Sequence, residues 1–259
     1  MILYYSGTGN SRFVAERLAE QLGEEVQNIE TFTTKEKLEG ESIGLIFPVY
    51  AWGVPHIVQT FIRQCLAQFY TPNTYLYAII TCGDDIGFAD RELQDILQQT
   101  LQHPADSIFS VQMTETYICL PGFDVDTKEE AQKKVSKATE RLAQLAQRIK
   151  HREAAIDVYR GPIPNIYHYV LRPIFRRWLM TDRYFHVDAS RCTGCGLCTK
   201  SCPAHDIRLS DGLPQWKNDT CEQCLRCYHH CPTRAIDWGR FTQGKKQALS
   251  PFKMQFHKI

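Results

Sequence analysis

The N-terminus lacks the features of a secretion signal, because residues 1–5 show no basic region, long apolar core or small-residue cleavage site. Long uncharged runs are also scarce. The stretch without a formal charge at residues 42–62 contains Pro48, Gly53 and Pro55, which are incompatible with a single membrane-spanning helix. From these absences we expect a soluble protein of the reducing cytoplasm, with no transmembrane segment.

Cysteine is scarce in the first 190 residues and dense after them. Only Cys65, Cys82 and Cys119 come before residue 190, whereas the other eight of the eleven cysteines lie between Cys192 and Cys231. In a reducing compartment, such a cluster binds metal more often than it forms disulfides. The dense region therefore predicts a metal site.

The clustered cysteines form two copies of the pattern CxxCxxCxxxCP, closed by Pro203 and Pro232. A constant offset of 29 residues relates the copies and also aligns Ile207 with Ile236, which indicates a duplicated unit. Three cysteines at this spacing can hold one iron-sulfur cube, and in the bacterial two-cluster pattern the last cysteine of each run ligates the other cube. The pattern predicts two 4Fe-4S clusters, one held by Cys192, Cys195, Cys198 and Cys231 and the other by Cys221, Cys224, Cys227 and Cys202.

Disulfides and structural zinc are the alternatives, but zinc sites normally supply two pairs of ligands separated by a longer loop. Residues 183–240 resemble bacterial two-cluster ferredoxins, which implies one-electron transfer and a small pseudo-twofold fold. With a cysteine at every iron corner, this domain alone is expected to perform no bond chemistry. Basic residues near the thiolates either attract an acidic redox partner or form a solvated face: Arg191, Lys200, Arg226, His229 and His230.

Charge is divided unevenly along the chain. Residues 1–150 hold 13 basic and 20 acidic residues, whereas residues 151–259 hold 17 and 9. A basic half can indicate nucleic acid or a membrane surface, but two thiolate-bound clusters would add negative charge to it, and we expect no nucleic-acid partner. With 43% hydrophobic and 23% charged residues, the 259-residue chain has the composition of about two globular domains.

Apolar runs and helical patterns alternate through the first 150 residues. The alternation is typical of the α/β class with a doubly wound parallel sheet, in which ligands bind at loops after the carboxyl ends of the strands. We predict strands at residues 2–5, 25–29, 43–47, 75–81 and 108–113, and helices at about residues 13–22, 55–67, 86–100 and 127–150.

The loop after the first predicted strand, residues 6–11, has the sequence SGTGNS. Its glycines allow close approach, and its hydroxyl, amide and N–H groups lie at a helix N-terminus, as in a phosphate cradle. The loop lacks the GKS or GKT signature of triphosphate sites, and Arg12 occupies the third glycine position of the dinucleotide pattern. These features favour a terminal monophosphate.

Residues 1–150 resemble flavodoxins, whose FMN phosphate is held by an SGTGN loop followed by serine or threonine. The resemblance implies a five-stranded sheet of order 2-1-3-4-5 and two further loops beside the flavin ring. The residues implied to bind FMN are Ser6, Thr8, Gly9, Asn10, Ser11, Pro48, Val49, Tyr50, Ala51, Trp52, Gly53, Thr81, Cys82, Gly83 and Asp84.

Within these loops, Tyr50 and Trp52 are expected to pack on the flavin ring, although aromatic residues under a loop often serve only as core. Cys82 lies either near the flavin or in the core, and we favour an inert buried thiol. Cys65 and Cys119 are interpreted as core, and residues 113–117 are expected to line the edge of the flavin site.

We divide the chain into a flavodoxin-like FMN domain at 1–152, a connector at 153–182, a ferredoxin domain at 183–240 and a basic tail at 241–259. The connector mixes aromatic and basic residues, as membrane-surface and partner-docking segments do. We favour interdomain packing, because Pro173 would interrupt a long amphipathic helix. The tail either lies against the acidic first domain or is disordered.

The two resemblances identify the chain as a member of the flavodoxin/ferredoxin fusion family and imply an electron-transfer protein suited to anaerobic conditions. FMN accepts two electrons and each cluster one, so the chain would link a one-electron redox protein partner to a two-electron process. The alternatives are an FMN-dependent reductase of a small acceptor, such as a quinone or nitro compound, and a docking module for a dedicated partner. No dedicated substrate site or catalytic residue is visible.

Overall fold

The structure is a computed structural model that describes residues 1–32, 42–217 and 220–254. Its largest sheet has six parallel strands in the order β2-β1-β3-β4-β5-β6. The strands are β1 Ile2–Tyr4, β2 Val26–Asn28, β3 Ser42–Pro48, β4 Tyr75–Cys82, β5 Ser107–Gln112 and β6 Ala155–Asp157. The predicted α/β class and the order 2-1-3-4-5 are confirmed.

The predicted number of five strands is wrong, because β6 adds a sixth strand at the edge of the sheet. It pairs with residues 107–109 of β5 and lies in the segment that the sequence assigned to the connector. The strand has only three residues, and Ile156 is exposed. So short a segment has no apolar alternation that separates it from a loop.

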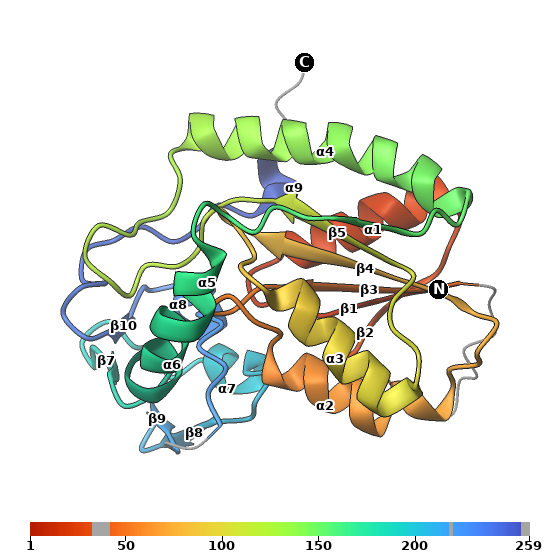
Figure 1. Cartoon of the computed structure of the whole chain (residues 1–259). Coiled ribbons are helices and arrows are strands. Elements are labelled where there is room, and N and C mark those ends of the chain that lie inside the picture. Colours follow the sequence, from red (N-terminus) through yellow and green to blue (C-terminus); the bar gives the residue numbers. More distant parts are fainter. Residues whose placement is uncertain (33–41, 218–219, 255–259) are drawn as a thin grey trace.

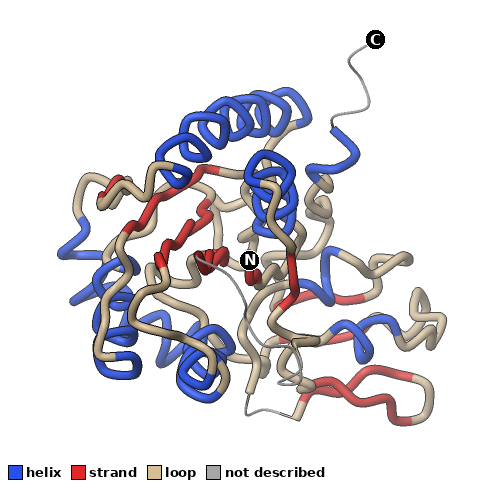
Figure 2. The backbone as a smooth tube through the Cα atoms, turned by 90° about the vertical axis from the view of Figure 1, so that its right-hand side faces the viewer, coloured by secondary structure: helices blue, strands red, loops and turns tan. Residues whose placement is uncertain are grey.

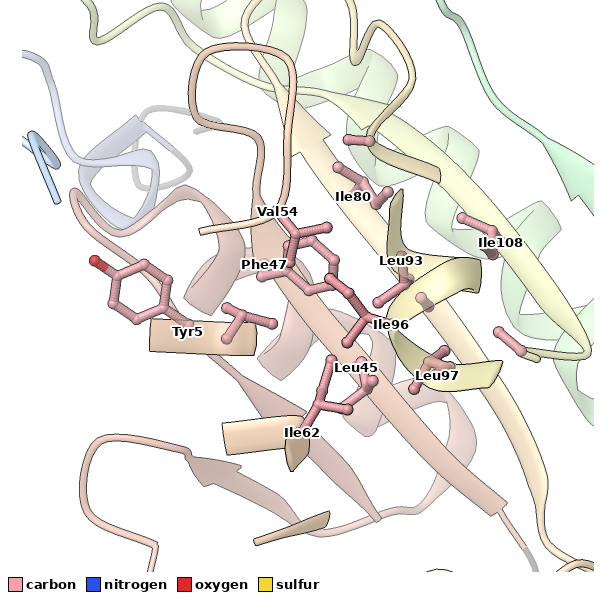
Figure 3. Packing of buried hydrophobic residues seen from close by; sticks show 14 of the residues in the cluster. Tyr5, Leu45, Phe47, Val54, Ile62, Ile80, Leu93, Ile96, Leu97 and Ile108 are labelled. Carbon is pink, nitrogen blue, oxygen red and sulfur yellow. The ribbon is translucent and has the colours of Figure 1, made fainter. Parts of the chain in front are cut away.

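Helices cover both faces of this sheet (Figures 1 and 2). The helices α1 Asn10–Leu22 and α4 Lys128–Lys150 cover one face, and α2 His56–Gln64 and α3 Ala89–Leu101 cover the other. All eight residues of β4 are buried, as expected for a central strand with helices on both sides. Figure 3 shows side chains of the strands and of α3 that pack together on the face covered by α2 and α3.

The cysteine-rich domain consists of two copies of one helix-and-strand unit. The helix α7 Leu197–Ser201 precedes the strands β8 Ile207–Ser210 and β9 Leu213–Trp216, which form an antiparallel pair. The helix α8 Arg226–His229 precedes β10 Ile236–Trp238, which pairs antiparallel with β7 Phe185–Val187. The two helices begin 29 residues apart, as the duplicated sequence pattern predicts.

The connector contains one continuous helical segment, residues 164–179. It consists of α5 Pro164–Ile166, a π-helical turn at Tyr167–Leu171, α6 Arg172–Ile174 and a second π-helical turn at Phe175–Leu179. The expectation that Pro173 interrupts a long helix is wrong. Proline lacks an N–H and crowds the preceding turn, and the wider π-helical turns on both sides of α6 adapt the backbone around it.

The C-terminal tail returns to the first domain. The helix α9 Pro251–Met254 lies beside α1 and α4, and the Phe252 ring packs edge-on against Phe13 at 5.5 Å between ring centroids. Residues 255–259 lie outside the described residues. Within the described residues, no helix combines the length and apolar character needed to cross a bilayer.

Candidate functional site

The predicted phosphate cradle lies between β1 and α1. Gly9 precedes α1 with a φ of 108°, a left-handed conformation that glycine adopts without strain. The Gly9 N–H donates to Ser6 Oγ at 3.1 Å, and Ser11 Oγ lies 2.7 Å from Thr81 Oγ1. The first bond fixes the conformation of the cradle, and the second joins the cradle to the end of β4.

Asn10 connects the cradle to the segment that follows β5. Its Nδ2 donates to the Thr114 carbonyl oxygen at 2.8 Å, and its Oδ1 accepts from Thr114 Oγ1 at 2.9 Å. The two bonds occupy both ends of the amide, so the side chain acts as a brace for the loop.

The cradle opens into a cavity of about 510 Å³, within the range of small-molecule and cofactor sites. All the predicted flavin-binding residues line this cavity except Gly9 and Gly53. Residues 114–117, which were expected at the edge of the flavin site, line it as well. Three groups that the prediction did not include also line it. These are Asp85 with Leu120 and Phe123; Tyr167, Leu171, Phe175 and Met180 of the connector; and residues 222–225 of the cysteine-rich domain.

The aromatic end of the cavity is built jointly with the connector. Trp52 stacks on Tyr167 with ring centroids 5.0 Å apart and an interplanar angle of 6°, and it meets Phe175 edge-on. Gly53 leaves room for the Arg172 guanidinium, which pairs with Glu92 at 2.6 Å. The aromatic loop therefore packs against the connector, an arrangement that local sequence could not reveal.

Acidic residues gather near Gly83. Asp84, Asp85 and Glu115 line the cavity, and the Glu115 carboxylate packs against Gly83. Burial raises the pKa of Glu115, although its carboxylate accepts backbone N–H bonds from Thr116 and Tyr117. The cavity thus contains a carboxyl group that holds its proton more tightly than an exposed glutamate does.

The isolated cysteines have different surroundings. Cys82 is buried at the cavity wall, and burial raises its pKa, in keeping with an inert thiol. Cys119 lies in the core between the domains, whereas Cys65 is only partly buried at the edge of the core.

The cavity fits a molecule with a phosphate at one end and a flat ring at the other. The helix N-terminus and hydroxyl groups of the cradle form one part of its lining, and the aromatic side chains of Trp52, Tyr167 and Phe175 form another. These donors and rings are the groups that the phosphate and the flat ring of FMN would contact.

The eight clustered cysteines surround two small cavities. Cys192, Cys195, Cys198 and Cys231 line one, and Cys202, Cys221, Cys224 and Cys227 line the other. These are the two groups expected from the two-cluster pattern. Backbone N–H groups donate to sulfur atoms of Cys202, Cys221 and Cys231 at 3.2–3.4 Å.

Disulfides and structural zinc were the alternatives to iron-sulfur clusters for these cysteines. All eleven cysteines are free thiols. Among the described residues, no three metal-binding side chains converge as a single metal ion requires. Each of the two cavities is lined by four cysteines, which is the number of protein ligands that a 4Fe-4S cluster takes.

The group formed by Cys202, Cys221, Cys224 and Cys227 lies directly against the 510 Å³ cavity, which we call the flavin-type cavity. Cys224 lines both its own cluster cavity and the 510 Å³ cavity. A Cβ atom added at Gly7 would lie 3.1 Å from Cys224 Cβ, so the cradle and the cysteine loop are in close contact. The Glu222 carboxylate accepts N–H bonds from His56 and Ile57 at the start of α2.

The fold and these cavities define a flavoprotein-type α/β domain joined to an iron-sulfur domain. The family described as a flavodoxin domain matches residues 1–112, and the family described as a 4Fe-4S dicluster domain matches residues 191–236. The chain is therefore a fusion of a flavodoxin domain and a 4Fe-4S dicluster domain. The first implies FMN and the second implies iron-sulfur, and together they support a function in electron transfer.

Individual relatives match only short parts of the chain. A component of an ion-translocating oxidoreductase complex from Methanosarcina acetivorans is 39% identical over 46 residues, which is 18% of this chain and 17% of that protein. An uncharacterized protein of Methanocaldococcus jannaschii is 30% identical over 61 residues, which is 24% of this chain and 23% of that protein. The chain thus spans less than a quarter of either relative.

Among solved structures, a flavodoxin of Streptococcus pneumoniae TIGR4 is similar with a TM-score of 0.39 and 18% identity. The match covers 58% of this chain and 97% of the flavodoxin.

Proposed function

We propose that this protein transfers electrons between two 4Fe-4S clusters and FMN, and links a one-electron protein partner to a two-electron process. The observation that carries the proposal is the position of Cys224, which belongs to one cysteine group and also lines the cavity of the cradle. When bound, FMN supplies two-electron chemistry and each cluster supplies one-electron chemistry. The two kinds of site share a wall.

The chain's own residues hold the two domains in this arrangement. Arg226 Nε donates to the Gly7 carbonyl oxygen at 3.0 Å, and Arg226 Nη2 donates to the Ser6 carbonyl oxygen at 2.6 Å. Arg226 Nη1 also donates to the Ser201 carbonyl oxygen at 2.8 Å. This side chain of the second cysteine run thus bonds to the cradle and to the first cysteine run.

The two cysteine groups differ in their access to solvent. This difference supports an assignment of one cluster to contact with the partner and of the other to contact with FMN. Cys224 faces the flavin-type cavity, whereas Cys195 of the other group is exposed. A redox protein partner would therefore exchange electrons at the Cys195 side. Lys200 and Arg208 are exposed in the same repeat and favour an acidic partner.

An anaerobic redox titration, followed by paramagnetic resonance for the clusters and by absorption for the flavin, tests this proposal. We expect one FMN and about eight irons per chain, and we expect electrons added to the clusters to reach the flavin of the same molecule. Protein stripped of FMN is the control and should retain the cluster signals. Zinc without acid-labile sulfide, or clusters that exchange no electrons with the flavin, would reject it.

The second candidate is an FMN-dependent reductase of a quinone or nitro compound. It is favoured by the apolar part of the cavity beyond the predicted flavin loops, formed by Leu120, Phe123, Leu171 and Met180. Steady oxidation of chemically reduced protein by such acceptors, with no protein partner present, would support this candidate. Electron delivery only to a redox protein would support the first.

A further inference from the structure

The helical segment 164–179 has two faces with different surroundings. Its inner face contains Tyr167, Leu171 and Phe175, spaced by four residues, and these side chains line the flavin-type cavity. In Figure 1 the segment lies beside the cysteine-rich domain, at the end of the sheet where this cavity is found. Interdomain packing therefore accounts for the inner face.

The outer face of this segment is apolar and open to solvent. Together with Ile163 just before the segment, it contains Ile166, Tyr169, Val170, Ile174 and Trp178, and all six are between 45% and 68% exposed. Most of these residues recur at intervals of three or four, so they form a stripe along the whole segment. Packing between the domains does not explain this stripe, because the described residues leave it uncovered.

The charged residues of the helical segment itself are all of one sign. No acidic residue occurs between Asp157 and Asp182. Arg172 is buried and paired with Glu92, but Arg176 and Arg177 are exposed and form no ion pair with described residues. The Arg177 guanidinium lies 5.8 Å from the centre of the Trp178 ring. The stripe therefore ends beside two cations that no described residue neutralises.

We propose that the outer face binds the surface of an anionic lipid bilayer. Aliphatic residues with tryptophan and tyrosine, next to arginines and without acidic residues, are the composition of helices that lie in a membrane interface. An interface with another protein would carry about one hydrogen bond per 100–200 Å² of buried surface. The stripe contributes only the Tyr169 hydroxyl and the Trp178 indole N–H for such bonds.

This arrangement has a consequence for the cavity. Leu171 and Phe175 line the cavity on the inner face, while Val170 and Ile174 would enter the lipid headgroup region on the outer face. A bound bilayer would then lie one helix diameter, about 10 Å, from the cavity. The proposal goes beyond electron transfer and does not depend on it, because lipid binding is measured without any redox reaction.

Flotation of the full, cofactor-loaded protein with vesicles tests the proposal. We expect binding to vesicles that contain phosphatidylglycerol and at least about tenfold weaker binding to vesicles of phosphatidylcholine alone. The double variant Arg176→Gln with Arg177→Gln should weaken binding by about fivefold for each charge removed. The control is Lys133→Gln with Lys137→Gln, which removes two exposed charges from α4 and should bind as the original protein does.

Apolar substitutions test the stripe itself. Ile166→Ser with Ile174→Ser should reduce binding by about tenfold or more, whereas Leu249→Ser, at an exposed leucine outside the stripe, should not. Flavin and iron contents must match in all variants, which separates loss of binding from loss of folding. Trp178 should show a blue shift of its fluorescence on binding, and Trp178→Phe should abolish that shift.

Three results would overturn the proposal. The first is the absence of binding to anionic vesicles at low ionic strength. The second is equal binding by the stripe variants and their controls. The third is concentration-dependent self-association that the stripe variants abolish, because the outer face would then be an interface between copies of this chain.

Discussion

Arg226 and Glu30 form an ion pair across the boundary between the two domains, with 2.6 Å between Arg226 Nη2 and Glu30 Oε1. Both side chains are mostly buried, at 13% and 15% exposure. Arg226 begins α8, and Glu30 follows β2 in the flavodoxin domain. A buried pair of this kind is costly to break by removing one partner, because the other charge is left without compensation. Domain contact and cradle geometry are therefore linked.

We predict that Arg226→Ala lowers both the stability and the FMN affinity of the protein. Removing one partner of a buried ion pair costs about 3–5 kcal/mol, which corresponds to a fall in the melting temperature of about 6–20 °C in a chain of this size. The bonds to the cradle carbonyls are lost as well, so the Kd for FMN should rise by about tenfold or more. Flavin fluorescence during titration and heating measures both quantities.

Two variants show whether the effect comes from this pair. Arg63→Ala removes an exposed arginine from α2 and should change neither quantity appreciably. The double variant Arg226→Ala with Glu30→Ala should be more stable than Arg226→Ala alone, because no unpaired carboxylate remains. Unchanged FMN affinity in Arg226→Ala would show that the domain contact does not support the cradle.

Gly7 allows the cradle and the cysteine loop to meet, and we predict that Gly7→Ala separates them. The added Cβ would collide with the Tyr50 hydroxyl and lie 3.1 Å from Cys224 Cβ. Overpacking of this kind costs about 1–3 kcal/mol, and electron exchange between clusters and flavin should slow. Rapid-mixing absorption measures that rate. Adding Tyr50→Phe should restore part of it, and failure to do so would place the strain elsewhere.

The brace formed by Asn10 predicts a specific loss of flavin affinity. Asn10→Ala removes two hydrogen bonds to Thr114, and at about 1 kcal/mol each the Kd for FMN should rise by roughly tenfold or more. Thr114→Val removes only the side-chain bond and should produce a smaller rise. Asn165→Ala, at an exposed position of the connector, is the control. Equal affinity in Asn10→Ala and the control would contradict the brace.

The sequence predicted the parts of this molecule that have a local pattern. The strands β3 and β4 are continuous apolar runs, and the cradle and the cysteine runs carry spaced motifs, so each could be recognised from a few neighbouring residues. The helical pattern of α4 also begins at Thr127, where the structure has a capping box with Glu130.

Contacts between distant segments could not be predicted in this way. The positions of Glu222, Cys224 and Arg226 against the flavodoxin domain depend on how two surfaces fit, and no periodicity or motif describes that fit. The stacking of Trp52 on Tyr167 was missed for the same reason. The helix through Pro173 was missed because proline is a strong local signal that tertiary packing overrode.

Glu115 predicts a dependence of stability on pH. Its pKa is raised, first by burial and further by Asp84, while the Thr116 and Tyr117 N–H bonds and Lys134 oppose the shift. A raised carboxyl pKa means that the folded state binds the proton more tightly than the unfolded state. The ionised carboxylate therefore lowers the free energy of unfolding. This loss of stability is fully present above the pKa of the folded state, decreases as the pH falls through that pKa, and is absent below the ordinary value of about 4.3.

We therefore predict that Glu115→Gln raises the melting temperature at about pH 8 and that this gain shrinks as the pH is lowered toward about 5. The amide oxygen can still accept the N–H bonds of Thr116 and Tyr117, so the change chiefly removes the charge. Glu140→Gln, at an exposed position of α4, should show no such trend. Comparing each variant with the original protein at the same pH cancels any loss of clusters in acid. A gain in stability that is independent of pH would indicate that packing, and not ionisation of Glu115, limits the fold here.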